Sequence, residues 1–322
     1  NRKFFIFTKA LLTDGKGNAT GTVSVFLDIT EQKAHEKLKR SMEEEKLIID
    51  EMQKYDRLKN EFFSNISHEL RTPLNVIFCA VQLMEMNLND QKREIRPEFI
   101  KKNVSTIRQN SLRLLRLVNN LIDMTKIDAQ AFEIKLCNRD IVDAVKEITL
   151  NAGDYIEKKG LKLVFHTDVE EKIMAFDEEK IERILLNLIS NAIKFSPRGA
   201  AIYVNLTDNG DTISIKVRDM GIGIPPERQK DIFQRFYQIS PLHTRLREGS
   251  GIGLNLVKSL VEMHQRTITV NSEYGSGATF IVELPCIVLP EGKTEKMEST
   301  GRQVRMESIQ LEFSDIYLGN NT

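Results

Sequence analysis

Apolar residues recur at steps of three and four between Thr30 and about Asn87, the spacing that places side chains on one face of an α-helix. This seam contains Ile48, Met52, Tyr55, Phe62, Ile66, Leu70, Leu74, Ile77 and Val81, and the polar Lys59 interrupts it. A second stripe follows the polar segment 87–98 and contains Ile100, Val104, Ile107, Ser111, Leu114, Val118 and Leu121. The two stripes predict an antiparallel helical hairpin. Because one hairpin leaves part of its seam uncovered, we expect two copies to pair into a dimeric four-helix bundle.

The segments on either side of the hairpin have hydrophobic patterns that differ from the helical one. Residues 1–30 predict two strands around the turn-rich "TDGKGNATG", and we interpret them as the edge of a larger sheet because a lone hairpin is only marginally stable. Residues 131–286 alternate strands with helices and predict a separate α+β domain, with clear strands in "LKLVFHT", "AIYVNLTD", "TISIKVRD" and "ATFIVELP". Residues 287–322 are mostly charged and polar, with a strand-like alternation in "SIQLEF", and we expect a mobile tail.

Composition narrows the class of protein. The 322 residues include 46 basic and 46 acidic side chains, so no net charge favours binding to nucleic acid or to a membrane surface. The three cysteines form no CxxC pair, which argues against a zinc ribbon or a disulfide framework and favours a reducing, cytoplasmic compartment. No apolar run reaches about 18 residues, and the chain begins with Asn1. We therefore expect part of a longer protein whose membrane attachment, if it has one, lies in segments absent from this chain.

The string "SHELRTPL" concentrates reactive side chains on the first predicted helix. A step of two residues rotates a helix by about 200°, so His68, two residues from seam positions on either side, faces water. Pro73 has no amide hydrogen for the carbonyl of Glu69, so the helix should loosen or bend there. Glu69 is placed to bond the imidazole δ nitrogen, and Thr72 is placed one turn further on to orient a water. The alternative is an ordinary amphipathic helix with polar surface residues.

A second polar group lies in "ERILLNLISNAIKF". Asn187, Asn191 and Lys194 are spaced by four and three, so they share one helix face opposite an apolar one. Amide oxygens suit Mg²⁺ and an ammonium suits phosphate. A solvated helix face is the alternative, although charged residues are commoner there than two asparagines.

Glycine-rich segments complete the candidate site. In "RDMGIGIP" a carboxylate at a strand end precedes glycines that let the backbone approach a flat base, and the residues concerned are Asp219, Gly221 and Gly223. In "EGSGIGLNLVKSL" the residues before an amphipathic helix offer backbone amides to phosphate, and they are Gly249, Gly251, Gly253 and Leu254. A dinucleotide-binding fingerprint is the alternative for these last glycines, but the early βαβ setting is missing. Between the two segments, Phe233 and Phe236 are expected under a mobile stretch in which Arg245 or Arg247 is a candidate phosphate contact.

These motifs, in this order, resemble the sensor histidine kinases of two-component systems over about residues 55–285. "SHELRTPL" resembles their phosphoacceptor box, "ERILLNLISNAIKF" their N box, and the glycine segments their nucleotide-binding boxes. The resemblance implies that His68 is phosphorylated, that Glu69 is its acid/base partner, and that Thr72 helps to hydrolyse phosphate from a regulator. It also implies that Asn191 is the Mg²⁺ ligand, supported by Asn187 and Lys194, and that Asp219 contacts adenine.

The same resemblance implies a domain order and a reaction. Its domains are the C-terminal hairpin of a PAS-like sensor (1–30), a signalling helix (31–54), a dimerisation and phosphotransfer hairpin (55–130) and an α/β-sandwich, Bergerat-type ATP-binding domain (131–286). It implies ATP and Mg²⁺ as cofactors, and transfer to an aspartate on the receiver domain of a separate response regulator, with phosphatase activity. Two other classes stay open: an ATPase of the gyrase and chaperone type, for which the histidine helix has no role, and a non-catalytic dimeric scaffold with a dead nucleotide site.

Overall fold

The computed structural model describes residues 3–13, 15–89, 96–157, 159–234, 237, 251–290 and 302–316. Its contacts divide the chain into two units, Asn1–Glu61 and Phe62–Thr322. None of the helices in these described ranges is both long and apolar enough to cross a bilayer.

The first unit consists of a β-hairpin and the beginning of a helix. Strands β1 (Phe5–Thr13) and β2 (Ala19–Asp28) pair antiparallel and confirm the predicted hairpin. Phe7 lies opposite Phe26, with ring centroids 4.8 Å apart. The carboxylate of Asp28 accepts a hydrogen bond from the amide of Thr30 at 2.9 Å, which fixes the start of the helix. Both strands are exposed along their whole length, so within the described residues the hairpin has no core of its own.

Two long helices follow, as the two stripes predict. Helix α1 (Thr30–Asn89) continues without a break through Pro73, and α2 (Pro97–Asp128) begins with a proline, whose missing amide costs nothing at that position. On either side of His68, the hydroxyls of Ser67 and Thr72 donate to the carbonyls four residues earlier. Pro73 lies inside this single helix.

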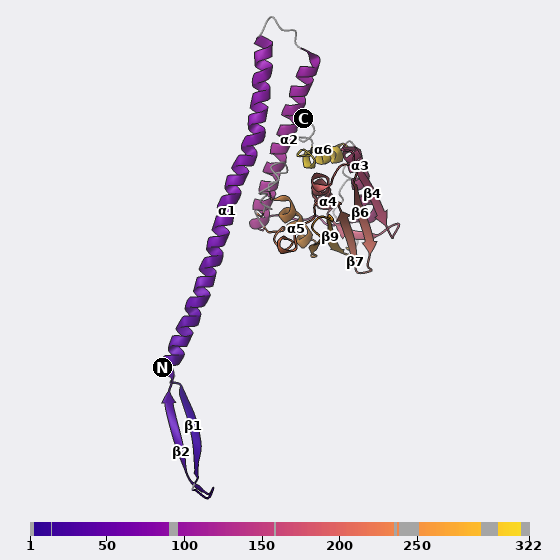
Figure 1. Ribbon diagram of the computed structural model, residues 1–322. Helices are drawn as coiled ribbons and strands as arrows, with labels where there is room; N and C mark the ends of the chain where they lie inside the picture. Colours follow the sequence, from indigo (N-terminus) through magenta and orange to yellow (C-terminus); the bar gives the residue numbers. More distant parts are fainter. Residues whose placement is uncertain are drawn as a thin grey trace. The chain divides into compact units, whose positions relative to one another are not determined.

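The rest of the second unit is an α/β sandwich, drawn in Figure 1. A five-stranded sheet has the order β4-β6-β7-β9-β8, in which β4 and β6 are parallel and the other neighbours antiparallel. Its strands are β4 (Lys162–Thr167), β6 (Ala201–Asp208), β7 (Thr212–Arg218), β8 (Ile268–Ser272) and β9 (Ala278–Pro285). A small sheet pairs β3 (Cys137–Asp140) with β5 (Ile173–Phe176). The four strands read from the alternating pattern are confirmed, whereas β3, β5 and β8 were not identified.

Helices α3 (Ile141–Glu157), α4 (Glu178–Phe195) and α5 (Gly253–Met263) supply the second layer, and a 3₁₀ turn, η1 (Pro226–Arg228), follows the glycine segment after β7. The apolar face of α4 is buried in the core with alternate residues of β6, such as Ile202 and Val204. Asp177 caps α4 by accepting from the amide of Lys180 at 3.2 Å. The helical hairpin followed by a sandwich is the predicted fold class.

The prediction of a mobile tail over 287–322 is wrong where the structure describes it. Ile287 accepts a hydrogen bond from the amide of Ala175, and residues 302–312 form α6 (Arg302–Glu312), in yellow in Figure 1. Ile309 and Phe313, four residues apart, share one helix face and are fully buried in the sandwich core. The alternation in "SIQLEF" suggested a strand, but burial follows the helical step of four. Tyr155 of α3 packs edge-on against Phe313, with ring centroids 5.9 Å apart.

Candidate active site

Helix α1 presents His68 to solvent, as the two-residue step predicts. His68 and Thr72 are exposed, while Phe62 and Ile66 on the opposite face are buried. The Thr72 hydroxyl donates to the carbonyl of His68 at 3.1 Å, so both residues lie on one strip of α1. Glu69 is half-buried, and its charge contributes to the raised pKa of Arg116 on α2.

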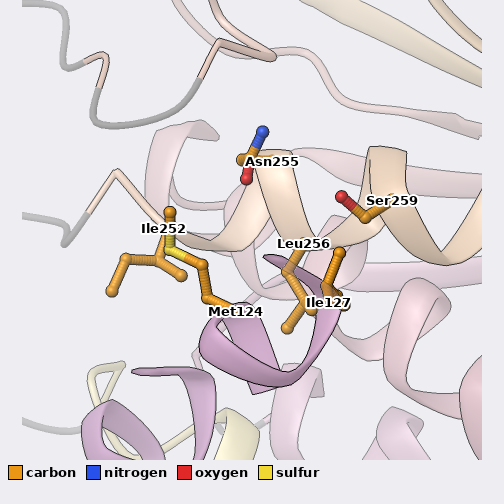
Figure 2. Close-up of a pocket in the computed structure, with 6 residues that line it drawn as sticks. All are labelled: Met124, Ile127, Ile252, Asn255, Leu256 and Ser259. Atoms are coloured by element: carbon orange, nitrogen blue, oxygen red, sulfur yellow. The ribbon is translucent and has the colours of Figure 1, made fainter. Parts of the chain in front are cut away.

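An apolar junction connects the base of the helical hairpin to the glycine segment before α5. Ile252 is buried with Phe62, Ile66 and Met124. Figure 2 shows Met124 of α2 beside Ile252, at the small crevice whose lining residues are Met124, Ile127, Ile252, Asn255, Leu256 and Ser259. The crevice is too small to admit a water molecule, so it is a packing junction and not a ligand pocket. Its effect is to hold the start of α5 against the helices that carry His68.

The polar face of α4 meets the start of α5. Asn187 is only 1% exposed, whereas Asn191 and Lys194 are half-buried. A β-carbon at Gly253 would lie 2.6 Å from the side-chain oxygen of Asn187, so glycine permits this close approach. The structure thus brings two predicted segments together, the asparagine face and the glycine segment. Gly251 has a positive φ of 66°, and Gly249 lies outside the described residues.

The loop after β7 holds Asp219 in a buried position. Its Oδ1 atom accepts from the amides of Gly221 at 2.8 Å and Ala278 at 3.3 Å. Burial raises the pKa of Asp219, and these two backbone bonds partly oppose the rise. A β-carbon at Gly221 would meet the carbonyl oxygen of Phe195 at 2.6 Å, and one at Gly223 would meet that of Glu273 at 2.0 Å. Both glycines are therefore required by close backbone contacts.

The aromatic pair is described in part. Phe233 is buried and packs edge-on against Phe280, with ring centroids 6.2 Å apart, and its carbonyl accepts from the side-chain amide of Asn255 at 3.0 Å. Phe236, Arg245 and Arg247 lie outside the described residues.

The end of α6 adds acidic residues that the sequence analysis did not identify. Glu312 accepts from Arg116 Nε at 2.8 Å and from Asn187 Nδ2 at 3.3 Å. Asp315 pairs with Arg116 at 2.7 Å and with Lys194 at 3.2 Å, and Arg113 of α2 lies 3.2 Å from its second oxygen. Two of the predicted phosphate-side residues, Asn187 and Lys194, thus contact carboxylates of the C-terminal segment.

These contacts shift the protonation equilibria of the cluster. Burial alone would lower the pKa of Arg116, but Glu312 and Asp315 raise it above its ordinary value. Burial lowers the pKa of Lys194, and Asp315 opposes that effect. Burial would raise the pKa of Asp315, but Lys194, Arg116 and Arg113 hold it below its ordinary value. Three basic and two acidic side chains are thus paired in one network.

A cavity of about 160 Å³ adjoins this network, between α2, α4 and α6. Its lining includes Glu182 and Arg183 of α4 and Arg116 of α2. Burial raises the pKa of Glu182 to about 7, with smaller contributions from Glu178, Glu179 and Glu312. Arg183 bonds Asp123 and the side-chain oxygen of Asn120, which attaches α4 to α2. No signal in the sequence relates these residues, because they come from three helices far apart in the chain.

The chemistry that this arrangement supports is binding of a metal-complexed phosphate ester. Asn191 offers an amide oxygen, which suits Mg²⁺, and Lys194 and the free backbone amides at the start of α5 suit phosphate oxygens. Within the described residues no cluster of three or more His, Cys, Asp or Glu side chains forms a metal site of its own. The donors present therefore fit a magnesium ion that arrives with its phosphate ligand.

Two families match this architecture. Residues 58–130 match the His Kinase A (phospho-acceptor) domain, and residues 176–287 match the histidine kinase-, DNA gyrase B- and HSP90-like ATPase family. The sensor histidine kinase TmoS of Ectopseudomonas mendocina is 36% identical over 250 residues, which cover 76% of this chain and 25% of TmoS. The chain thus spans about a quarter of that relative.

Solved structures agree on the fold. The full-length histidine kinase ShkA, in complex with AMPPNP, matches with a TM-score of 0.53 and 26% identity over 70% of this chain and 46% of that one. The histidine kinase ThkA, in complex with the response regulator TrrA, matches with a TM-score of 0.50 and 22% identity over 88% of this chain and 75% of that one. With its phospho-acceptor hairpin and its ATPase domain in this order, the chain belongs to the sensor histidine kinases of two-component systems.

Proposed function

We propose that this chain binds Mg-ATP in its sandwich domain, phosphorylates itself on His68, and passes the phosphoryl group to an aspartate of a separate response regulator. The observation that carries the proposal is a solvent-facing histidine on α1, in the same structural unit as the asparagine face of α4 and the glycine segment of α5. The ATPase-family match and the nucleotide analogue named in the ShkA structure support ATP as the donor.

Each predicted residue has a role in this reaction. The ε nitrogen of His68 forms a bond to the γ-phosphorus while the bond to the bridging oxygen breaks and ADP leaves. Glu69 accepts the proton on the δ nitrogen and so keeps the ε nitrogen nucleophilic. Asn191, with Asn187 in support, would hold the Mg²⁺, which would neutralise phosphate charge. Lys194 and the amides at Gly251, Gly253 and Leu254 bind phosphate oxygens, and the Asp219 carboxylate accepts from the adenine amino group.

Phosphorylation of the chain by γ-labelled ATP with Mg²⁺ tests the proposal. We expect an acid-labile, base-stable label that is lost in His68→Gln, because a phosphoramidate bond to the imidazole is cleaved by acid and survives base, whereas phosphate esters of serine and threonine survive acid. His35→Gln, an exposed histidine on the same helix, is the matched control and should keep the label. A label that survives in His68→Gln contradicts the assignment, and the absence of label with no nucleotide binding favours the non-catalytic scaffold.

The working form in this proposal is a homodimer. Seam residues of the hairpin stay exposed in the single chain, among them Leu74 at 57%, Val104 at 50% and Val118 at 42%. A second copy covers such a surface by completing a four-helix bundle. Sedimentation equilibrium should give twice the chain mass, and a monomer at micromolar concentration would contradict it.

The partner is a receiver domain supplied in trans, by analogy with the regulator named in the ThkA structure, and it docks on the exposed strip around His68 and Thr72. Phosphatase activity towards that regulator is part of the proposal. A cytoplasmic location is also part of it, because the sequence has no CxxC pair and ATP is the donor. We further propose that residues 1–30 are the edge of a PAS-like sensor and that 31–54 transmit its signal to the hairpin at 55–130 and the ATP-binding domain at 131–286. The exposed apolar residues of β1 and β2 support this division.

A further inference from the structure

The C-terminal segment that follows the ATPase fold is attached to the site by both packing and charge. Ile309 and Phe313 anchor it in the sandwich core, and Glu312 and Asp315 project towards the polar face of α4. We propose that residues 302–316 act as a built-in competitor of ATP, in which these two carboxylates occupy positions that receive the phosphates of the nucleotide. This inference rests on the proposed nucleotide site.

The tail carboxylates contact residues that the proposed function assigns to the nucleotide. Asn187 and Lys194 lie on the helix face assigned to Mg²⁺ and phosphate, and each contacts a tail carboxylate, at 3.3 and 3.2 Å. An ammonium group that donates to Asp315 offers less to a phosphate oxygen, and the two anions repel each other at such distances. Tail and nucleotide therefore compete for the ammonium of Lys194, and Glu312 also holds the Asn187 side chain through its amide nitrogen.

The charge that surrounds the two tail carboxylates is positive and largely buried. Three cations, Arg113, Arg116 and Lys194, surround the two carboxylates, and their side chains are only 8–15% exposed. A buried positive cluster of this kind needs anionic partners. The same cations would repel a magnesium ion bound directly to Glu312 or Asp315, so the arrangement favours phosphate replacement over metal binding by the tail.

The tail carboxylates are also linked, through Arg116, to the neighbour of the proposed phosphoacceptor. Arg116, which both tail carboxylates contact, also interacts electrostatically with Glu69, the neighbour of His68. The tail thus connects α2, beside the phosphoacceptor, with α4, beside the nucleotide site. When Glu312 and Asp315 occupy this cluster, they oppose both the binding of the γ-phosphate and its delivery to the histidine.

The test compares nucleotide affinities of the whole chain with those of Glu312→Gln/Asp315→Asn. The amides keep the shape and one acceptor oxygen of each carboxylate while removing both negative charges. Calorimetric titration with ATP, ADP and adenosine, all with Mg²⁺, separates phosphate contacts from base contacts. We expect affinity for ATP to rise about tenfold, affinity for ADP to rise less, and affinity for adenosine to stay the same. Glu307→Gln, an exposed acid on the same helix, is the control and should change none of them.

Autophosphorylation supplies an independent readout. In the double variant the KM for ATP should fall while the rate at saturating ATP stays within twofold, because competition is lost at saturation. Asp315→Asn alone should show a smaller gain in ATP affinity, and it decides the question if the double variant does not fold. Unchanged or weaker ATP binding overturns the inference, as does an equal gain for adenosine. The proposed function is tested separately. It fails if the wild-type chain acquires no acid-labile label on His68, and the affinity measurements do not depend on that label.

Discussion

The buried Glu182 provides a direct test of the electrostatics of the cavity between α2, α4 and α6. Glu182 is 5% exposed as a residue, and the pKa of its carboxyl is about 7 instead of 4.5. Burial is the main cause, and the neighbouring carboxylates of Glu178, Glu179 and Glu312 add to it. Arg116 and Arg183 line the same cavity, but their guanidinium groups already pair with Glu312 and Asp123. Replacing Glu182 by Gln removes a charge that the folded state accommodates poorly.

The size and sign of the effect follow from linkage. A carboxyl with a raised folded-state pKa binds its proton more tightly when folded, so the free energy of unfolding falls as the pH rises from about 4.5 to about 7. The difference of about 2.5 pH units corresponds to about 3 kcal/mol, at 1.36 kcal/mol per unit. Glu182→Gln should therefore be up to about 3 kcal/mol more stable than the wild type at pH 8 and nearly equal to it at pH 4.5.

Urea unfolding followed by far-ultraviolet circular dichroism, repeated between pH 4.5 and 8, measures this difference. The quantity compared is the free energy of unfolding of the wild type minus that of the variant. Asp219, whose pKa is also raised by burial, changes this free energy equally in both proteins and cancels in the difference. Glu133→Gln, an exposed acid that does not contribute to the raised pKa of Glu182, is the control and should stay within about 0.5 kcal/mol at every pH. A difference that does not change with pH would refute the reasoning.

The remaining predictions concern packing, a strained glycine and the regulator. Phe313→Ala should lower the free energy of unfolding by about 3–5 kcal/mol in urea titrations, since the ring is fully buried; exposed Met306→Ala is the control, and equal losses would contradict the anchoring role. Gly223→Ala should cost more stability than Gly210→Ala, because both have positive φ but only Gly223 would place a β-carbon 2.0 Å from a carbonyl oxygen; equal melting temperatures would count against this clash. Thr72→Ala should spare autophosphorylation and slow dephosphorylation of the regulator by about tenfold; if both activities survive unchanged, the role given to Thr72 is wrong.

The sequence determined the features that depend on local spacing. The step of two from Ile66 to His68 fixes the orientation of the histidine once α1 is helical, and the structure has Ile66 buried and His68 exposed. Strict alternation identified strands such as β6, because the period of two is built into an extended backbone. Asn187 and Lys194 could likewise be placed on one face by counting residues, and their chemistry follows from their side chains.

Only the tertiary structure decided what faces those residues. The short strands β3 and β5 have four residues each, too few for a pattern, and their pairing depends on the surrounding fold. Helix α6 looked like a polar tail, because its burial depends on α2, α3 and α4, which pack against it only in the folded chain. The contact of Arg116 with Glu312 joins residues 196 apart in the chain. Local periodicity reports the conformation of a segment, whereas the ion network around Arg116 and Asp315 exists only because packing brings α2, α4 and α6 together.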